Sequence, residues 1–305
     1  MVQSNSFNNK IIPNTFLIGA QKCATTSIYD WASQHPEICA PLSVKDYEYF
    51  TRKEFYSNKD LLSSFYEEVY NDEKIIFQGS VHYIYFKEAL ERIKIANPDS
   101  KFVLILRNPI ERAISAYNYA VKFNYEDLPI EEAFDMEDQR IETGDIRTLS
   151  ELTYKTHGLY YKQIAELLKI VNREQIHIIL YEDITENPEK VVKDLFSFLD
   201  VNNTFLPEFR TLNNTGQIRN KWIQKIGFGD SPIRNFFIRK VLRVFLSEER
   251  WAKLRFFVIH ANTKNAKTNY ESIISKETKN ELDAFFREDI DNLERFLGRD
   301  LSTWK

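Results

Sequence analysis

The sequence has little cysteine, little glycine and no long hydrophobic run. Its two cysteines, Cys23 and Cys39, cannot form a disulfide framework, and Cys and His cluster too rarely for a metal site. Eight glycines are too few for glycine-dense dinucleotide loops. No apolar run approaches the roughly 18 residues of a membrane span, and residues 1–10 lack the apolar core of a signal peptide. We therefore expect a protein without a metal or a transmembrane segment, in a reducing, cytoplasmic setting.

A large excess of one charge is also missing. The net charge is −4 at pH 7, which gives no general case for binding nucleic acid. The chain has 305 residues, of which 43% are apolar, so it can bury a large core. Apolar strand-like runs alternate with helical patterns, which predicts an α/β fold with a doubly wound, mostly parallel sheet flanked by helices. We expect one domain over residues 1–305, with a core at about 14–221 and a helical, basic C-terminal part at about 222–305.

The most informative stretch runs from Thr15 to Trp31. A short strand-like run ends at Gly19, and helical spacing of apolar residues follows. A strand, a tight turn and a helix aim free backbone N–H groups at an anion. Because Lys22 lies in the turn, we expect a cradle for phosphate or a related tetrahedral anion. The candidate binding residues are Gln21, Lys22, Cys23, Ala24, Thr25, Thr26 and Ser27.

This turn differs from the loop of nucleoside triphosphatases. The Walker A pattern needs two glycines and places Lys directly before Ser or Thr. Here one glycine is present, and two residues separate Lys22 from Thr25. The missing glycines argue against a loop that wraps a triphosphate.

A second motif follows the apolar run Phe102–Leu106, which is typical of a central parallel strand. Arg107 comes at its carboxyl end, where ligands bind in open α/β sheets. Ser115 lies two helical turns further on. A guanidinium with a nearby hydroxyl suits a phosphate monoester. Arg112, which faces solvent or pairs with a neighbour, is a weaker candidate.

Together the stretches Gly19–Ser27 and Arg107–Ser115 resemble sulfotransferases that use 3′-phosphoadenosine 5′-phosphosulfate (PAPS), and the bacterial and heparan-sulfate members most of all. The resemblance covers about residues 14–221 and implies a P-loop-kinase-like sulfotransferase fold. It implies that the first stretch binds the 5′-phosphosulfate and the second the 3′-phosphate. By the same resemblance, Gly216 and Arg219 belong to a segment that folds over the nucleotide; a solvent-exposed loop is the alternative.

Two residues compete for the role of general base. Residues 43–50 resemble a family segment whose Glu is the proposed base, and Asp46 stands at that position with a side chain one methylene shorter. His82 follows the predicted strand 74–77, where another branch of the superfamily carries its catalytic His. An imidazole suits proton removal from a hydroxyl. The alternatives are a surface ion pair of Asp46 with Lys45 and a structural role for His82.

The resemblance implies an enzyme that transfers a sulfuryl group from PAPS to a hydroxyl or amine. Lys22, Asp46 and His82 are its expected catalytic residues, and adenosine 3′,5′-bisphosphate is its product. A small molecule, a lipid or a glycan is the expected acceptor, and no metal is required. An ATP-dependent P-loop phosphotransferase and a non-catalytic protein that binds adenosine bisphosphate or glycans are the alternatives.

Several other segments have a recognisable character. Residues 125–151 carry ten acidic side chains, which indicates a solvated, partly helical face or an acidic rim for a cationic acceptor. Residues 219–267 carry twelve Lys or Arg against three acids, mixed with aromatics, which favours a lid over a contact with a glycan, membrane or nucleic acid. Residues 35–41 are interpreted as a connection, 60–70 as a helix and 275–297 as an amphipathic helix.

Overall fold

The computed structural model describes residues 10–209, 216–218, 263–265 and 273–305. The chain divides into two compact units. Unit 1 comprises residues 1–112, 156–213 and 282–305, and unit 2 comprises residues 113–155 and 214–281. The single sulfotransferase domain over residues 1–305 stays a prediction, and each unit is described by itself below.

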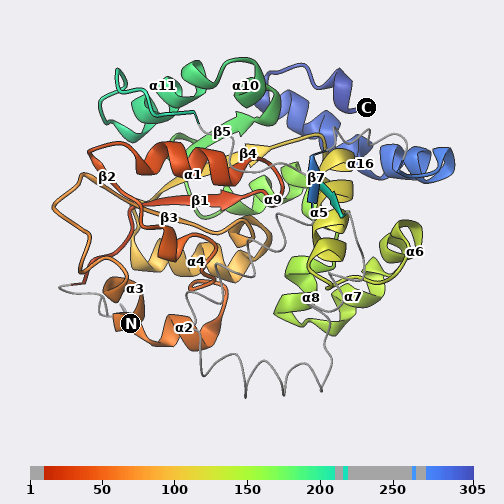
Figure 1. Ribbon diagram of the computed structural model, residues 1–305, viewed down its shortest axis with the longest axis horizontal. Coiled ribbons are helices and arrows are strands. Elements are labelled where there is room, and N and C mark those ends of the chain that lie inside the picture. The colour runs from red at the N-terminus through yellow and green to blue at the C-terminus, as the bar shows by residue number, and fades with distance from the viewer. Residues whose placement is uncertain (1–9, 210–215, 219–262, 266–272) are drawn as a thin grey trace. The chain divides into compact units, whose positions relative to one another are not determined.

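Unit 1 contains a five-stranded sheet in the order β2-β3-β1-β4-β5, in which every neighbouring pair is parallel (Figure 1). The adjacent inner strands β1 and β4 consist almost entirely of buried apolar residues, as expected where helices cover both faces of a sheet. The predicted α/β class is confirmed. The strands are β1 (Thr15–Gly19), β2 (Ile38–Cys39), β3 (Ile75–Gly79), β4 (Lys101–Leu106) and β5 (Ile176–Leu180).

Helices cover both faces of this sheet. Helices α1 (Thr25–Ser33) and α11 (Pro188–Leu199) lie on one face, and α4 (Lys87–Ala96) and α9 (Tyr160–Leu167) lie on the other (Figure 1). The sheet is therefore doubly wound, as predicted. The predicted C-terminal amphipathic helix is α16 (Lys276–Leu297), which buries Leu282, Phe286, Ile290 and Leu293. The short helices α2 (Lys53–Ser57), α3 (Lys59–Ser64) and α10 (Tyr181–Glu186) and the 3₁₀ turns 42–44, 83–85, 156–158, 173–175 and 302–304 complete the described elements.

Two expectations about this unit are wrong. The segment 35–41 is more than a connection, because Ile38 and Cys39 pair with β3 as an edge strand. Prolines flank these two residues without removing either of their N–H donors. The expected helix over 60–70 ends at Ser64, and Val69 is 45% exposed instead of packed.

In unit 2 the acidic segment is partly helical, as predicted. Helix α5 (Pro109–Lys122) begins in unit 1 and continues into unit 2. The short helices α6 (Ile130–Asp135), α7 (Glu137–Thr143) and α8 (Ile146–Glu151) follow it, and β6 (Gly216–Ile218) pairs antiparallel with β7 (Thr263–Asn265).

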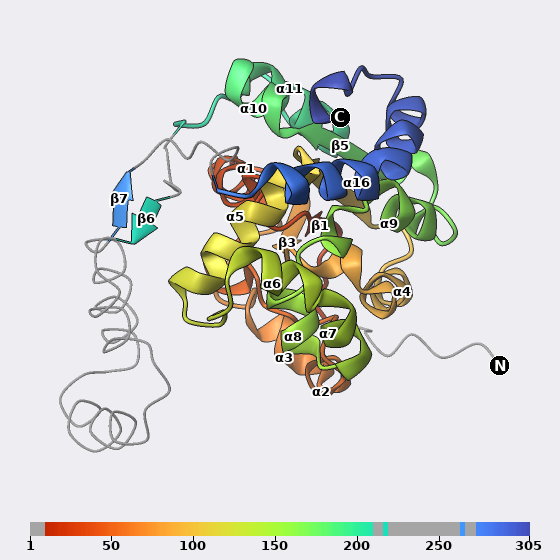
Figure 2. The same ribbon diagram turned by 90° about the vertical axis from the view of Figure 1, so that its right-hand side faces the viewer.

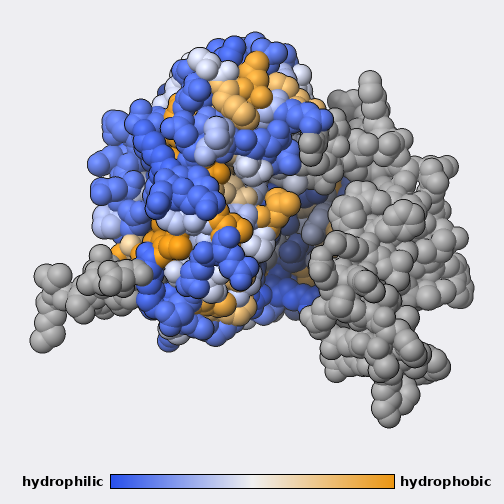
Figure 3. Space-filling view, turned by 60° about the vertical axis from the view of Figure 1, so that its left-hand side comes forward, coloured by the Kyte–Doolittle hydropathy of each residue, from blue (hydrophilic) through white to orange (hydrophobic). Residues whose placement is uncertain are grey.

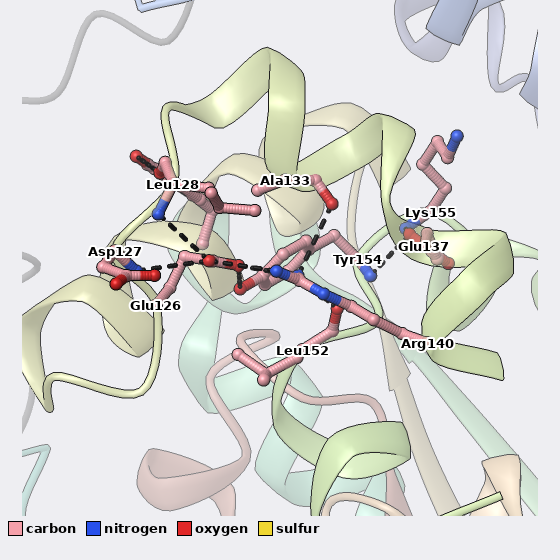
Figure 4. A network of polar contacts seen from close by, with 10 residues as sticks. Glu126, Asp127, Leu128, Ala133, Glu137, Arg140, Leu152, Tyr154 and Lys155 are labelled. Carbon is pink, nitrogen blue, oxygen red and sulfur yellow. Dashed lines mark hydrogen bonds and ion pairs between the residues drawn. The ribbon is translucent and has the colours of Figure 1, made fainter. Parts of the chain in front are cut away.

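Two of the acidic side chains are buried in unit 2, so the solvated face is wrong for Glu126 and Glu137. The Glu126 carboxylate accepts hydrogen bonds from both terminal nitrogens of Arg140, at 2.6 and 3.0 Å, and from the hydroxyl of Tyr154 at 2.8 Å (Figure 4). Glu137 accepts the backbone N–H groups of Tyr154 and Lys155. Burial by itself raises the pKa of Glu126, but the hydrogen bonds from Arg140 and Tyr154 outweigh it and lower that pKa. The network joins the start and the end of the acidic segment.

The described surface shows hydrophobic residues in separated patches among hydrophilic ones on the face drawn in Figure 3. Among the described helices, none combines the length and the apolar character needed to cross a membrane.

Candidate anion-binding site

The turn between β1 and α1 has a backbone shaped for an anion. Lys22 and Ala24 adopt left-handed conformations, with φ of 69° and 63°, and Cys23 lies between them. Such alternation points successive N–H groups into one concavity. Within the described part of the chain, no acceptor takes the backbone N–H of Ala24, Thr25 or Thr26. These donors, at the positive end of α1, are available to an anion.

The side chains of the turn divide between the surface and the core. Lys22, Thr26 and Ser27 are partly exposed, whereas Gln21 and Thr25 are buried. The Cys23 side chain is fully buried, and burial raises the pKa of its thiol to about 11. Its N–H donates to the carbonyl of Ala20 at 3.3 Å. Lys22, Thr26 and Ser27 therefore lie on the accessible side, while the Cys23 thiol belongs to the core.

Arg107 lies beside this turn, because β4 is the direct neighbour of β1. Its Nη1 donates to the carbonyl of Lys22 at 3.4 Å. Nε and Nη2 donate to Glu111 Oε2 at 3.1 and 2.7 Å, and the guanidinium carbon lies 4.5 Å from the centroid of the Tyr181 ring. The structure thus brings the two predicted cations of the site to one edge of the sheet.

Asp46 lies near the end of β3, on the other side of β1. It has a left-handed φ of 60°, and its N–H donates to the carbonyl of Gly79 at 2.6 Å. Its carboxylate accepts the N–H of Val81 at 3.4 Å and Lys45 Nζ at 2.7 Å. The Asp46 side chain is 50% exposed, whereas the Lys45 side chain is only 8% exposed. The predicted ion pair is present, and its carboxylate is open to solvent.

His82 is 5% exposed. Burial is the main reason that its pKa falls to about 4; Asp46 raises it, while Arg112 and Lys45 lower it further. The imidazole is therefore neutral at pH 7. Because Asp46 raises the pKa of His82, the two candidate bases lie within electrostatic range of each other.

Three predicted residues lie outside unit 1 or outside the described residues. Ser115 and Gly216 belong to unit 2. Ser115 is buried on α5, and its hydroxyl has no hydrogen-bond partner among the described residues. Gly216 is the first residue of β6. Arg219 lies outside the described residues, as does the predicted lid apart from 263–265.

Sequence reasoning undervalued Arg112. The stretch Gly158-Leu159-Tyr160 resembles a family position near the active-site cleft, but that resemblance assigned no role to Tyr160. Arg112 is fully buried and lies within electrostatic range of both Cys23 and His82, so it adds positive charge beneath the site. The Tyr160 hydroxyl donates to the carbonyl of Arg107 at 2.9 Å. The burial of Arg112 and the contact of Tyr160 both depend on parts of the chain that are distant in sequence, so a local pattern does not predict either of them.

Metal ligands do not gather in the part of the chain that the structure describes: no group of three or more His, Cys, Asp or Glu there is suited to hold an ion.

The fold and the site define a parallel α/β protein with an anion-binding turn and a second cation at the neighbouring strand end. Comparison with known families places it more narrowly. Residues 13–224, which make up most of the chain, match the sulfotransferase domain family. The protein belongs to that family. The predicted family is confirmed.

Individual relatives agree with this assignment. The chain is 25% identical over 280 residues to the membrane-associated sulfotransferase kil1 of Dictyostelium discoideum, with 66% of this chain and 59% of that protein covered. It is 26% identical over 208 residues to the bifunctional heparan sulfate N-deacetylase/N-sulfotransferase 4 of mouse, with 62% and 22% covered. The chain therefore spans less than two thirds of either relative.

A solved structure is similar over nearly the whole chain. The sulfotransferase from Alicyclobacillus acidocaldarius superposes with a TM-score of 0.69 at 25% identity, covering 96% of this chain and 99% of that one. The predicted resemblance to bacterial and heparan-sulfate members is thus confirmed.

Proposed function

We propose that this protein is a sulfotransferase that moves a sulfuryl group from PAPS to a hydroxyl or amine. The observation that carries the proposal is the meeting of the Lys22 turn and Arg107 at the carboxyl ends of adjacent strands. One element offers N–H groups and an ammonium to an anion, and the other offers a guanidinium. A nucleotide with phosphates at both its 5′ and 3′ positions has the matching pair of anions.

The residues present fit this donor. The free N–H groups of Ala24, Thr25 and Thr26 suit the oxygens of a 5′-phosphosulfate. Lys22 stabilises the negative charge that grows on the departing phosphate oxygen. Arg107 binds the 3′-phosphate, and Ser115 stays a prediction from the sequence motif.

Asp46 is the proposed general base. Its carboxylate is half exposed and is held by Val81 N–H and Lys45, so it can reach an acceptor while keeping a fixed direction. His82 is the less favoured candidate, because its buried imidazole is less accessible to an acceptor than the half-exposed carboxylate. When bound, PAPS supplies the electrophilic sulfur. The new O–S or N–S bond to the acceptor forms as the S–O bond to the 5′-phosphate breaks, and the acceptor proton goes to the base.

The proposed acceptor is a small molecule, a lipid or a glycan. Two relatives support a saccharide, since their names describe N-sulfotransferases of heparan sulfate. Metal independence and a cytoplasmic location stay predictions.

Release of adenosine 3′,5′-bisphosphate from PAPS, measured with a panel of hydroxyl and amine acceptors, tests the proposal. We expect Lys22→Ala to lower the turnover at least about 100-fold, because one preorganised charge at the reacting oxygens contributes on that scale. Lys193→Ala, which removes an exposed ammonium from α11, is the matched control and should keep wild-type turnover. Wild-type turnover in Lys22→Ala would contradict the proposal.

A further inference from the structure

We propose that Tyr160 is a positioning residue that sets the spacing between the anion-binding turn and Arg107. The inference rests on the proposed function and deepens it, since it concerns how the site selects a nucleotide with two separated phosphate groups.

The phenol of Tyr160 contacts both halves of the site. Its hydroxyl donates to the Arg107 carbonyl at 2.9 Å, and it lies 3.9 Å from Sγ of Cys23 in the middle of the turn. Tyr160 is only 2% exposed, so water does not replace either contact. One rigid side chain therefore spans from the end of β4 to the turn that follows β1.

Helix α16 fixes the start of the helix that carries Tyr160. The buried carboxylate of Asp289 accepts the N–H groups of Tyr161 and Lys162 at 2.9 and 3.0 Å, so it satisfies the first donors of α9. Figure 2 shows α16 beside α9. The Tyr160 ring also meets Trp304 edge-on at 6.2 Å between centroids.

The turn just before α9 is closely packed. A Cβ added to Gly158 would lie 2.8 Å from Phe286 Cε1 and 2.9 Å from Pro109 Cβ. The approach to Tyr160 is therefore held between α16 and the first residue of α5, which itself follows Arg107 by two positions.

The contact is made to the main chain of Arg107, whereas its guanidinium makes the proposed phosphate contact. Loss of the phenolic hydroxyl should therefore leave both cations present but let their spacing vary. A ligand that bridges the turn and Arg107 depends on that spacing, and a ligand with a 5′-phosphate alone does not. Selectivity for the 3′,5′-bisphosphate is the property that Tyr160 controls.

Binding of adenosine 3′,5′-bisphosphate, adenosine 2′,5′-bisphosphate and 5′-AMP to the full chain tests this inference. In Tyr160→Phe we expect the 3′,5′-isomer to bind about five- to tenfold more weakly, which is the effect of one buried hydrogen bond. The affinity for 5′-AMP should change less than about twofold, and the preference for the 3′,5′-isomer over the 2′,5′-isomer should fall. Tyr66→Phe is the matched control, because Tyr66 is equally buried and donates to a strand carbonyl, that of Phe77, at 3.1 Å. It should lose stability like Tyr160→Phe but keep the isomer preference.

If Tyr160→Phe leaves the ratios of the affinities for the three nucleotides unchanged, the inference is overturned, whether or not the melting temperature falls. The proposed function would remain intact. A wild-type protein that binds the 3′,5′-bisphosphate no better than 5′-AMP would instead overturn the proposed function, and the inference with it.

Discussion

At the scale of single residues, Asp46 and His82 differ mainly in their access to solvent. The carboxylate is half exposed and held by two donors, whereas the imidazole is buried and has a pKa of about 4. An acceptor can reach the half-exposed carboxylate more readily than the buried imidazole, so the geometry favours Asp46.

Substitution separates the two candidates. Asp46→Asn keeps the shape of the side chain but removes its capacity to take a proton, so turnover should fall about 100-fold or more. The affinity for adenosine 3′,5′-bisphosphate should stay within about twofold, because no step of donor binding uses the carboxylate. Steady-state turnover and calorimetric binding measure the two effects. Near-normal turnover in Asp46→Asn, together with a collapse in His82→Gln, would assign the base to His82.

His82 should also make stability depend on pH. Its pKa is about 4 in the folded protein and about 6.5 in an unfolded chain. Between these values the unfolded chain binds the proton that the folded chain does not, so the free energy of unfolding falls as the pH drops from 6.5 to 4. The loss amounts to at most about 3 kcal/mol, from 1.4 kcal/mol per pKa unit.

Urea unfolding of wild type and His82→Gln at pH 7 and pH 4.5 measures this contribution. Burial also lowers the pKa of His177 to about 4, so His177→Gln serves as the comparison and should remove a separate part of the pH dependence. An identical pH dependence in wild type and His82→Gln would contradict the buried, neutral imidazole.

The sequence motif located the candidate anion-binding residues along the chain, but it did not predict which way each one faces. Cys23 stands in the middle of the motif, yet its thiol is buried under the turn. Arg112 was expected to face solvent or to pair with a neighbour, and because it is fully buried the first alternative is wrong. The direction of such side chains depends on contacts with distant parts of the chain, and a local pattern contains no information about them.

At the scale of elements, long runs were predictable and short ones were not. The strand before Gly19 and the strand 102–106 are unbroken apolar runs, and the helix near the C-terminus is amphipathic; the structure contains all three. Strand β2 has two residues, too few for any period to appear. The acidic segment was interpreted from its net charge, which cannot show that Arg140 folds back onto Glu126.

That buried pair should stabilise unit 2. Glu126→Gln keeps the size of the side chain but leaves the Arg140 guanidinium without its carboxylate, and we expect unfolding to become easier by about 3 kcal/mol. Asp194→Asn breaks the exposed pair with Lys190 and is the matched control, with an expected cost below about 1 kcal/mol. Chemical denaturation of both variants measures the difference. Equal costs would contradict a stabilising role for the network in Figure 4.

At the scale of the whole molecule, the strand order explains why distant segments build one site. With β1 between β3 and β4, their carboxyl ends place Asp46, the Lys22 turn and Arg107 along one edge of unit 1. Alternation of strands and helices predicted the class of this fold. The sequence could not predict that Tyr160 joins two of the segments, because the contact spans more than 50 residues in the chain.

The central claim is that the site binds a nucleotide through separate 5′ and 3′ anions. Calorimetric binding of adenosine 3′,5′-bisphosphate beside ADP and ATP, with and without Mg²⁺, tests it most directly. We predict tight, metal-independent binding of the bisphosphate and weaker binding of ADP and ATP. In Arg107→Ala the bisphosphate should lose at least about tenfold in affinity, the scale of one charge-assisted contact, with 5′-AMP little changed. A preference for ATP that requires Mg²⁺, or an equal loss for the bisphosphate and 5′-AMP in Arg107→Ala, would contradict the account.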